Sequence, residues 1–195
     1  MNTFDDIDTL QQQSVAIAGL GGLGSNIAVM LTRSGVGHLL LIDYDTVEGS
    51  NLNRQHYMPR HIGRPKTEAL AEQLREINPA VQLTIKYEKI TAENAADLFR
   101  GWPLICEAMD EPAAKAMLIN TLLPDAEKII VAGSGMAGYG SANSIKTTRK
   151  MKRLYLCGDE TSDMQNERML APRVQLCAAH QANMILRILL GEMDP

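Results

Sequence analysis

The sequence lacks the cysteine pattern of a thiolate metal site. Its three cysteines, Cys106, Cys157 and Cys177, form no CxxC pair. Three scattered thiols cannot supply the four ligands of such a site, so we expect no structural zinc. They also cannot all pair with one another inside the chain, which favours a reducing cytoplasmic location over a secreted one.

Charge and hydropathy argue against two further classes of protein. With 19 Lys and Arg against 23 Asp and Glu, the net charge is −4, which is not the basic footprint of a nucleic-acid binder. No apolar run approaches the ~18 residues that a membrane-spanning helix requires. The polar residues 1–13 contain no basic run followed by an apolar stretch, so they do not resemble a signal peptide. We therefore expect neither a nucleic acid nor a membrane as a partner.

Strand and helix signals alternate along the chain, and its length of 195 residues predicts one domain, spanning 1–195. The expected strands are 14–18, 38–42, 81–87, 104–108 and 129–132, with later strands near 144–147 and 153–157. The expected helices are 25–34, 65–77, 91–100 (capped by Thr91), 112–122 and 172–190. Repeated strand–helix units predict an α/β, Rossmann-like, mostly parallel sheet with helices on both faces. Antiparallel strands would follow, before a long C-terminal helix.

A glycine turn joins the first expected strand to the first helix. Gly19, Gly21 and Gly24 have the GxGxxG spacing, and Gly22 lies between them. The first glycine allows a tight turn, the second lets the backbone approach a phosphate, and the third lets helix and strand pack closely. Asp43 ends the second strand, where a carboxylate can accept hydrogen bonds from ribose hydroxyls. This combination predicts nucleotide binding, and the alternative is a purely structural turn.

Three charged residues downstream of the glycine turn are suited to a triphosphate. Arg54 lies in the polar segment 50–55, and its planar guanidinium can bridge two phosphate oxygens. Lys66, at the start of the next expected helix, can bring a point charge to the same anion. Asp110 follows the strand 104–108 and can hold Mg²⁺ at the carboxyl end of the sheet. Taken singly, these residues could be two surface charges and a helix cap. Taken together, they favour phosphoryl-group chemistry over hydride transfer.

These motifs resemble, in order, those of the superfamily that adenylates ubiquitin-like proteins, which includes MoeB, ThiF and the ubiquitin-activating enzymes. The resemblance extends from about residue 14 to residue 191. The matching segments are Gly19-Leu-Gly-Gly-Leu-Gly24, Gly35-Val-Gly37, Asp43-Tyr-Asp45, Ser50-Asn-Leu-Asn-Arg-Gln55, Gly63-Arg-Pro-Lys66, Ile77-Asn-Pro79, Asp110, and Ala171-Pro172 with Gln181.

The resemblance implies carboxylate adenylation with ATP and magnesium. The implied site comprises Asp43 for the ribose, Arg54 and Lys66 for the phosphates, Asp110 for magnesium, and Asn51 and Gln55 in the lining. The catalytic groups would be Arg54, Lys66 and Asp110. The shortness of the chain and the glycine-rich segment 133–140 are most similar to ThiF-type proteins of thiamin biosynthesis. This similarity implies a ThiS-like ubiquitin-like sulfur carrier, a separate sulfur donor protein and a homodimer.

Many members of this superfamily bind zinc through two CxxC pairs, which this sequence lacks, and it departs from the superfamily in two further places. Relatives that bind their carrier covalently have a cysteine in the loop before the last helix. Here that loop, 158–169, has no cysteine, and Cys157, which borders it, is more often a structural than a reactive residue at such a position. Some relatives reach an N-terminal arginine into the partner's site, whereas residues 1–13 contain no Lys or Arg. The basic run 149–153 could meet an acidic carrier or be a solvated strand end.

Three alternatives remain open. The same ATP site could activate a peptide, a small molecule or a tRNA base. The glycine turn and Asp43 alone would permit an NAD-dependent oxidoreductase, but the trio of Arg54, Lys66 and Asp110 argues against it. A non-catalytic carrier-binding module is disfavoured because no expected ATP-site residue is missing.

Overall fold

The structure is a computed structural model that describes residues 9–163 and 166–195. Residues 1–8, most of the N-terminal segment in which we noted no Lys or Arg, lie outside the described residues. So do positions 164 and 165 of the loop before the last helix.

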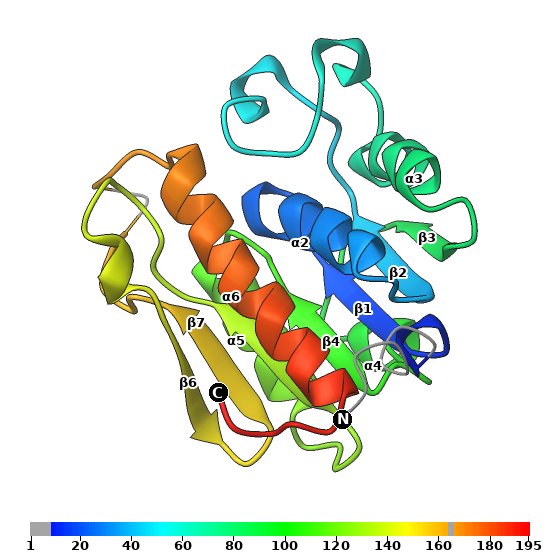
Figure 1. Cartoon of the computed structure of the whole chain (residues 1–195), viewed down its shortest axis with the longest axis vertical. Coiled ribbons are helices and arrows are strands. Elements are labelled where there is room, and N and C mark those ends of the chain that lie inside the picture. The colour runs from blue at the N-terminus through cyan, green and yellow to red at the C-terminus, as the bar shows by residue number, and fades with distance from the viewer. Residues whose placement is uncertain (1–8, 164–165) are drawn as a thin grey trace.

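The described residues form a seven-stranded sheet in the order β3-β2-β1-β4-β5-β7-β6 (Figure 1). The strands are β1 (Ser14–Ala18), β2 (His38–Asp43), β3 (Gln82–Tyr87), β4 (Leu104–Glu107), β5 (Ile129–Gly133), β6 (Lys146–Met151) and β7 (Leu154–Gly158). All neighbouring pairs are parallel except β6 and β7, which are antiparallel. The predicted mostly parallel sheet with a late antiparallel addition is therefore confirmed.

Helices cover both faces of the sheet (Figure 1). One face carries α2 (Gly22–Arg33), α3 (Lys66–Ile77) and α6 (Ala171–Leu189), and the other carries α4 (Ala95–Leu98) and α5 (Pro112–Leu122). The 3₁₀ turns are Gly49–Asn51, Pro59–His61 and Ala142–Ser144. No helix in the described part of the chain combines the length and hydropathy of a membrane span.

Alternation along the buried strands explains the two layers of helices. In β1, Val15 and Ile17 belong to the core beneath α2 and α6, whereas Ala16 and Ala18 belong to the core beneath α4 and α5. Successive side chains of a strand point to opposite faces, so a strand covered on both sides is apolar throughout. The continuous apolar runs in the sequence therefore predicted these central strands well.

Three expected boundaries were wrong. The helix expected from residue 25 already begins at Gly22, within the glycine turn. The helix expected over 91–100 is limited to α4, and Thr91 does not cap it. Instead the backbone amide of Thr91 donates a 2.7 Å hydrogen bond to Asn94 Oδ1, a local turn that keeps residues 91–94 out of the helix. The strand expected from residue 144 begins at Lys146, because Ala142–Ser144 forms a 3₁₀ turn capped by the Ser141 hydroxyl.

The two halves of the sheet diverge between β1 and β4. The connection after β1 leads to α2 on one face, and the connection after β4 leads to α5 on the other. Parallel sheets bind ligands at the carboxyl ends of two such strands, where the connections separate.

Candidate functional site

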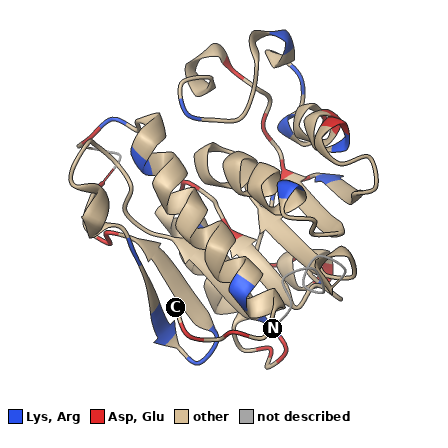
Figure 2. Cartoon of the chain, viewed as in Figure 1, with Lys and Arg blue, Asp and Glu red and all other residues tan. Residues whose placement is uncertain are grey.

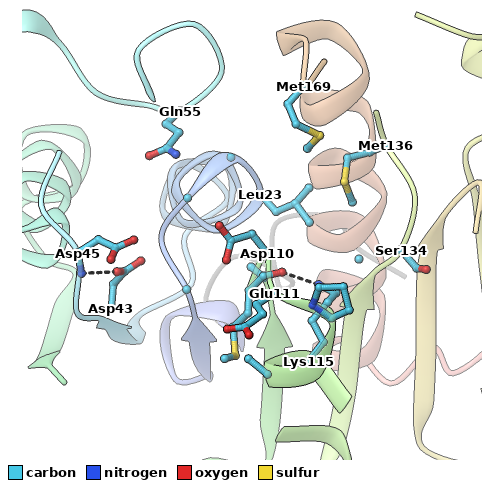
Figure 3. A pocket seen from close by; sticks show the side chains of 18 of the residues that line it. Leu23, Asp43, Asp45, Gln55, Asp110, Glu111, Lys115, Ser134, Met136 and Met169 are labelled. Carbon is cyan, nitrogen blue, oxygen red and sulfur yellow. Dashed lines mark hydrogen bonds between the residues drawn. The ribbon is translucent and has the colours of Figure 1, made fainter. Parts of the chain in front are cut away.

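A pocket of about 440 Å³ opens at this carboxyl edge of the sheet (Figure 3), which is within the usual size range for small-molecule sites. Its lining comes from the glycine turn, the segments that follow β2 and β3, the loops after β4, β5 and β7, and Met169 before α6. Eight of the ten predicted site residues belong to the lining: Gly19, Gly21, Gly22, Asp43, Arg54, Gln55, Lys66 and Asp110.

The glycine turn requires glycine for steric reasons. Gly19 has a φ of +89°, and a Cβ there would lie 2.9 Å from Ala108 O. A Cβ on Gly24 would lie 1.9 Å from Gly19 O, so Gly24 packs the helix against the turn and does not reach the pocket. Gly21 and Gly22 expose the first turn of α2 to the pocket, and amide groups at a helix N-terminus favour an anion.

Asp43 holds the glycine turn against the end of β2. Its Oδ2 accepts a 2.6 Å hydrogen bond from the Leu20 amide, and its Oδ1 accepts one of 2.8 Å from the Asp45 amide. The residue is 8% exposed, and burial raises the pKa of its carboxyl group, although Lys66 opposes the shift. A carboxylate has about four acceptor positions, so lone pairs remain for ribose hydroxyls.

Lys66 begins α3 and forms an ion pair that the sequence analysis missed. Its Nζ lies 2.7 Å from Asp45 Oδ2, and the Lys66 side chain is 7% exposed. The Tyr57 hydroxyl donates a 2.8 Å hydrogen bond to Leu20 O and lies 3.4 Å from Lys66 O. Tyr57 and Asp45 therefore join the glycine turn to the start of α3. The alternating carboxylates Asp43 and Asp45 were the available sequence signal.

Of the three site residues predicted in the polar segment 50–55, two line the pocket and one does not. Arg54 donates to Ser50 O at 3.0 Å and to Asn53 Oδ1 at 2.8 Å, so its guanidinium rests on its own loop at the rim. Gln55 is buried beside Gly21, and within the described residues its Oε1 has no hydrogen-bond partner. Asn51 is absent from the described lining, and its Oδ1 accepts from the Glu48 amide at 3.1 Å.

Asp110 lies in the short loop between β4 and α5, which a buried ion pair fixes. Lys115 Nζ is 3.0 and 2.9 Å from the two carboxylate oxygens of Glu107 and donates to Met109 O at 2.6 Å. Glu107 is fully buried, and burial raises the pKa of its carboxyl group despite the opposing charge of Lys115. This pair could not be predicted from the sequence, because nothing local links Glu107 to a lysine one turn into α5.

The donor set fits a nucleoside triphosphate with magnesium. The pocket combines the amide groups at the N-terminus of α2, the Gln55 Oε1 that has no partner among the described residues, and Gly21 and Gly22, which put no side chain into the lining. Figure 3 shows Asp43 and Asp45 on one side of the turn and Asp110 further along the pocket. Among the described residues no cluster of three His, Cys, Asp or Glu could hold a metal alone. A magnesium ion at Asp110 would therefore take its other ligands from phosphate and water, as is usual for this ion.

The three cysteines are buried in the core. Burial raises the pKa of Cys157 to about 11 and that of Cys177 to about 12, and it also raises the pKa of Cys106. Because the thiolate is the reactive form, the raised pKa values lower the reactivity of these thiols at neutral pH in the folded protein. Burial therefore favours a structural role for Cys157.

Apart from Lys150, which pairs with the pocket-lining Glu160, the basic run 149–153 lies away from the pocket. It covers the end of β6 and the turn to β7, where Lys and Arg residues gather (Figure 2), and this turn is at the amino end of β7, opposite the pocket edge. Arg153 donates to the carbonyls of Leu123, Asp125 and Lys128. Arg149 donates to Lys152 O, and Lys150 pairs with Glu160 at 2.7 Å. The run is therefore largely committed to internal contacts.

Known proteins resemble this chain in sequence and in structure. The model of the ThiF family matches residues 3–195. Ubiquitin-like modifier-activating enzyme 5 of Arabidopsis thaliana is 46% identical over 99 residues, which are 51% of this chain and 23% of that protein. Adenylyltransferase and sulfurtransferase UBA4 of Yarrowia lipolytica is 34% identical over 112 residues, 57% of this chain and 28% of that protein. The matched part thus spans about a quarter of these relatives' lengths.

Solved structures share the fold. The tRNA N6-threonylcarbamoyladenosine dehydratase TcdA of E. coli, in complex with AMP, has a TM-score of 0.87 and 21% identity, and the match covers 96% of this chain and 90% of that one. E. coli MccB with ATP has a TM-score of 0.74 and 23% identity, covering 97% and 59%.

Proposed function

This chain belongs to the ThiF family, and on that premise we propose that it is an ATP-dependent adenylyltransferase. Its substrate would be the C-terminal carboxylate of a ubiquitin-like carrier protein. The observation that carries the proposal is the convergence of the glycine turn, Arg54, Lys66 and Asp110 on one pocket. The relatives that are named modifier-activating enzymes and adenylyltransferase support the same reaction.

In the proposed reaction the carrier carboxylate attacks the α-phosphorus of ATP. A bond forms between a carboxylate oxygen and the α-phosphorus. The bond from the α-phosphorus to the oxygen that bridges it to the β-phosphorus breaks, and pyrophosphate leaves with that electron pair. The acceptor carboxylate is already ionised, so no general base is needed. The task of the protein is alignment and charge stabilisation.

Each pocket residue then has a role. Asp43 receives the ribose hydroxyls, and the amides of the first turn of α2 face the phosphates. Arg54 leaves its two loop acceptors to bind phosphate oxygens, and Lys66 adds a charge already oriented by Asp45. Asp110 contributes the carboxylate for a magnesium ion, which when bound neutralises phosphate charge.

The finer assignment is a ThiS-like sulfur carrier in thiamin biosynthesis, with a separate protein donating sulfur to the adenylate. It is supported by the similarity of the glycine-rich segment 133–140 to ThiF-type proteins and by the absence of a cysteine from the described part of the loop before α6. We also propose one ATP-binding adenylation domain over 1–195, a homodimer, and no structural zinc.

Pyrophosphate exchange into ATP tests the proposed function, with candidate carrier proteins supplied one at a time and a tRNA pool as a separate arm. Asp110→Ala should abolish the magnesium-dependent exchange with an unchanged fold, because Asp110 is exposed. Arg54→Ala should lower the rate by roughly 10²-fold or more, as when a preorganised charge stabiliser is removed. Arg75→Ala, an exposed change on α3 outside the pocket, is the control.

Normal exchange by both site variants would refute the residue assignment. Exchange with tRNA alone would refute the carrier assignment, and tighter binding of NAD than of ATP would refute the reaction class.

A further inference from the structure

One wall of the pocket is built by two loops that lie apart from the nucleotide-binding half. These loops are residues 134–137, after β5, and residues 160–163, after β7. Figure 3 shows Ser134 and Met136 on the side of the glycine turn away from Asp43 and Asp45. If the ribose lies at Asp43 and the phosphates at the start of α2, this wall faces the approach of the second reactant.

A buried ion pair behind the wall holds its two loops together. Arg173, in the first turn of α6, donates from Nε to Ala137 O at 3.0 Å and from a terminal nitrogen to Ser141 O at 2.8 Å. Its other terminal nitrogen pairs with Asp159 Oδ2. The side chains of Arg173 and Asp159 are only 6% and 9% exposed. We call this pair, with its loop contacts, the Arg173–Asp159 clamp.

Asp159 continues the clamp into the second loop. Its Oδ1 accepts hydrogen bonds from the amides of Thr161 at 2.9 Å and Ser162 at 2.8 Å. The Ser162 hydroxyl in turn accepts one from the Ala137 amide at 3.0 Å. The network therefore closes on itself, from Arg173 through both loops and back to Ala137.

The loops approach so closely that glycine is required between them. Gly135 has a φ of +78°, and a Cβ there would lie 2.2 Å from Asp159 Oδ1. A Cβ on Gly158 would lie 1.8 Å from Ser134 O. The amides of Asp159 and Glu160 donate to Gly135 O and Ser134 O, each at 2.9 Å. A loss of the clamp would therefore shift both loops together.

Neither charge of the clamp belongs to the pocket lining. Burial alone would raise the pKa of Asp159, but the amides of Ser162 and Thr161 and the Arg173 guanidinium hold it below its ordinary value. The pair is thus ionised at neutral pH, and its two charged groups interact with each other and with the backbone of the two loops.

We propose that Arg173 and Asp159 are positioning residues that set the wall against which the acceptor carboxylate of a protein tail approaches the α-phosphorus. This inference rests on the proposed function. The wall presents the hydroxyl groups of Thr161 and Ser162 and the thioether of Met136, and the carboxylate of Glu160 is paired with Lys150 at 2.7 Å. Hydroxyl and thioether groups can hydrogen-bond to and pack against an extended polypeptide tail.

The test uses two changes made together, Arg173→Met and Asp159→Asn. Removing one partner leaves an unpaired buried charge that can unfold a protein, whereas removing both charges avoids that cost. Arg173→Lys is the conservative variant, because a lysine can still pair with Asp159 but cannot also serve Ala137 and Ser141 with a planar fork. Arg187→Met is the control, since Arg187 lies on the same helix, is 38% exposed and is distant in sequence from the clamp.

Three measurements are made on each variant: hydrogen–deuterium exchange of residues 134–138 and 159–163, the Kd of α,β-methylene-ATP, and the KM and kcat for a ThiS-like carrier in pyrophosphate exchange. The double variant should lose about tenfold or more of amide protection in both loops, the effect of losing a charged hydrogen bond. Its carrier kcat/KM should fall on the order of 10²-fold through misalignment, with the nucleotide Kd unchanged. Arg173→Lys should lie between the double variant and the wild type.

Unchanged loop protection would overturn the clamp, and so would unchanged carrier kinetics or a nucleotide Kd that rises in step with the carrier KM. If the wild-type protein binds the ATP analogue but none of the carriers supports pyrophosphate exchange, the proposed function fails, and the role of the wall in positioning the acceptor fails with it. The hydrogen–deuterium exchange of the two loops then still decides whether the clamp holds the wall.

Discussion

Replacing Lys115 by methionine should destabilise the protein by leaving Glu107 charged and unpaired in the core. Glu107 is fully buried, and Lys115 Nζ lies within 3.0 Å of both its oxygens. After the substitution, one hydrogen-bond donor to the Glu107 carboxylate remains among the described residues. It is the Met109 amide, at 2.7 Å. Breaking a buried ion pair from one side costs about 3–5 kcal/mol. This is a large part of the ~5–15 kcal/mol that stabilises a typical domain.

The deficit should depend on pH in a defined direction. Burial already raises the pKa of Glu107, and Lys115 is the strongest opposing influence, so Lys115→Met raises the pKa further. A carboxyl group whose pKa is higher in the folded than in the unfolded state binds its proton more tightly when folded. The variant therefore gains stability, relative to the wild type, as the pH falls towards the ordinary glutamate pKa of about 4.3. It loses that stability as the pH rises through the folded pKa.

Urea unfolding followed by circular dichroism at pH 7 and at pH 5 measures both effects. Lys152→Met, in the exposed turn between β6 and β7, is the matched control and should leave stability nearly unchanged. The double variant Glu107→Gln/Lys115→Met should recover part of the loss because no charge remains. A deficit at pH 7 below about 1 kcal/mol, the usual value of a surface pair, would refute the reasoning. If the loss of unfolding free energy is the same at pH 7 and at pH 5, the expected pH dependence is wrong.

Three further predictions concern the thiols, the zinc content and the assembly. The three cysteines should resist alkylation at pH 8 in the folded protein, because burial raises their pKa values, and all three should react in denaturant without a chelator. Elemental analysis of the same preparation should give zinc well below one equivalent, and rapid alkylation of Cys157 in the native state or stoichiometric zinc would contradict these expectations. Sedimentation velocity at micromolar concentration should show a homodimer; a monomer both with and without ATP would contradict it.

Local sequence signals predicted much of the fold because they depend on neighbouring residues. The buried runs in β1, β2, β4 and β5 are apolar on both faces, and the glycine spacing marks the strand-to-helix turn. The helix expected from Thr91 was wrong because the Thr91 amide donates a hydrogen bond to the Asn94 side chain, which forms a turn instead of the first helical residues. Helix propensities do not include the energy of such a side-chain contact, so they cannot predict which of the two conformations is more stable.

The sequence predicted residues that line the pocket but not the groups behind them. Lys66, Arg54 and Asp110 could be predicted from residue type and position at the ends of elements. The partners of Lys66 and Arg173, which are Asp45 and Asp159, lie 21 and 14 positions away in the sequence. Such pairs form only when the fold brings loops together, and no local period records them. Asn51 is the opposite case. It was predicted to line the site because it belongs to a matching motif, but its side chain accepts a hydrogen bond within its own loop, from the Glu48 amide.

The position of β1 between β2 and β4 has a consequence for synthesis on the ribosome. β2 and β3 follow β1 within the first 87 residues, whereas β4 begins only at Leu104. Until β4 emerges, the nascent sheet keeps the apolar strand Ser14–Ala18 at its rim, with backbone groups free to pair with a neighbouring chain. Residues 15–18 of this strand, which are fully buried in the folded protein, therefore stand at an open edge while the polypeptide is growing, where they need protection from pairing with other chains.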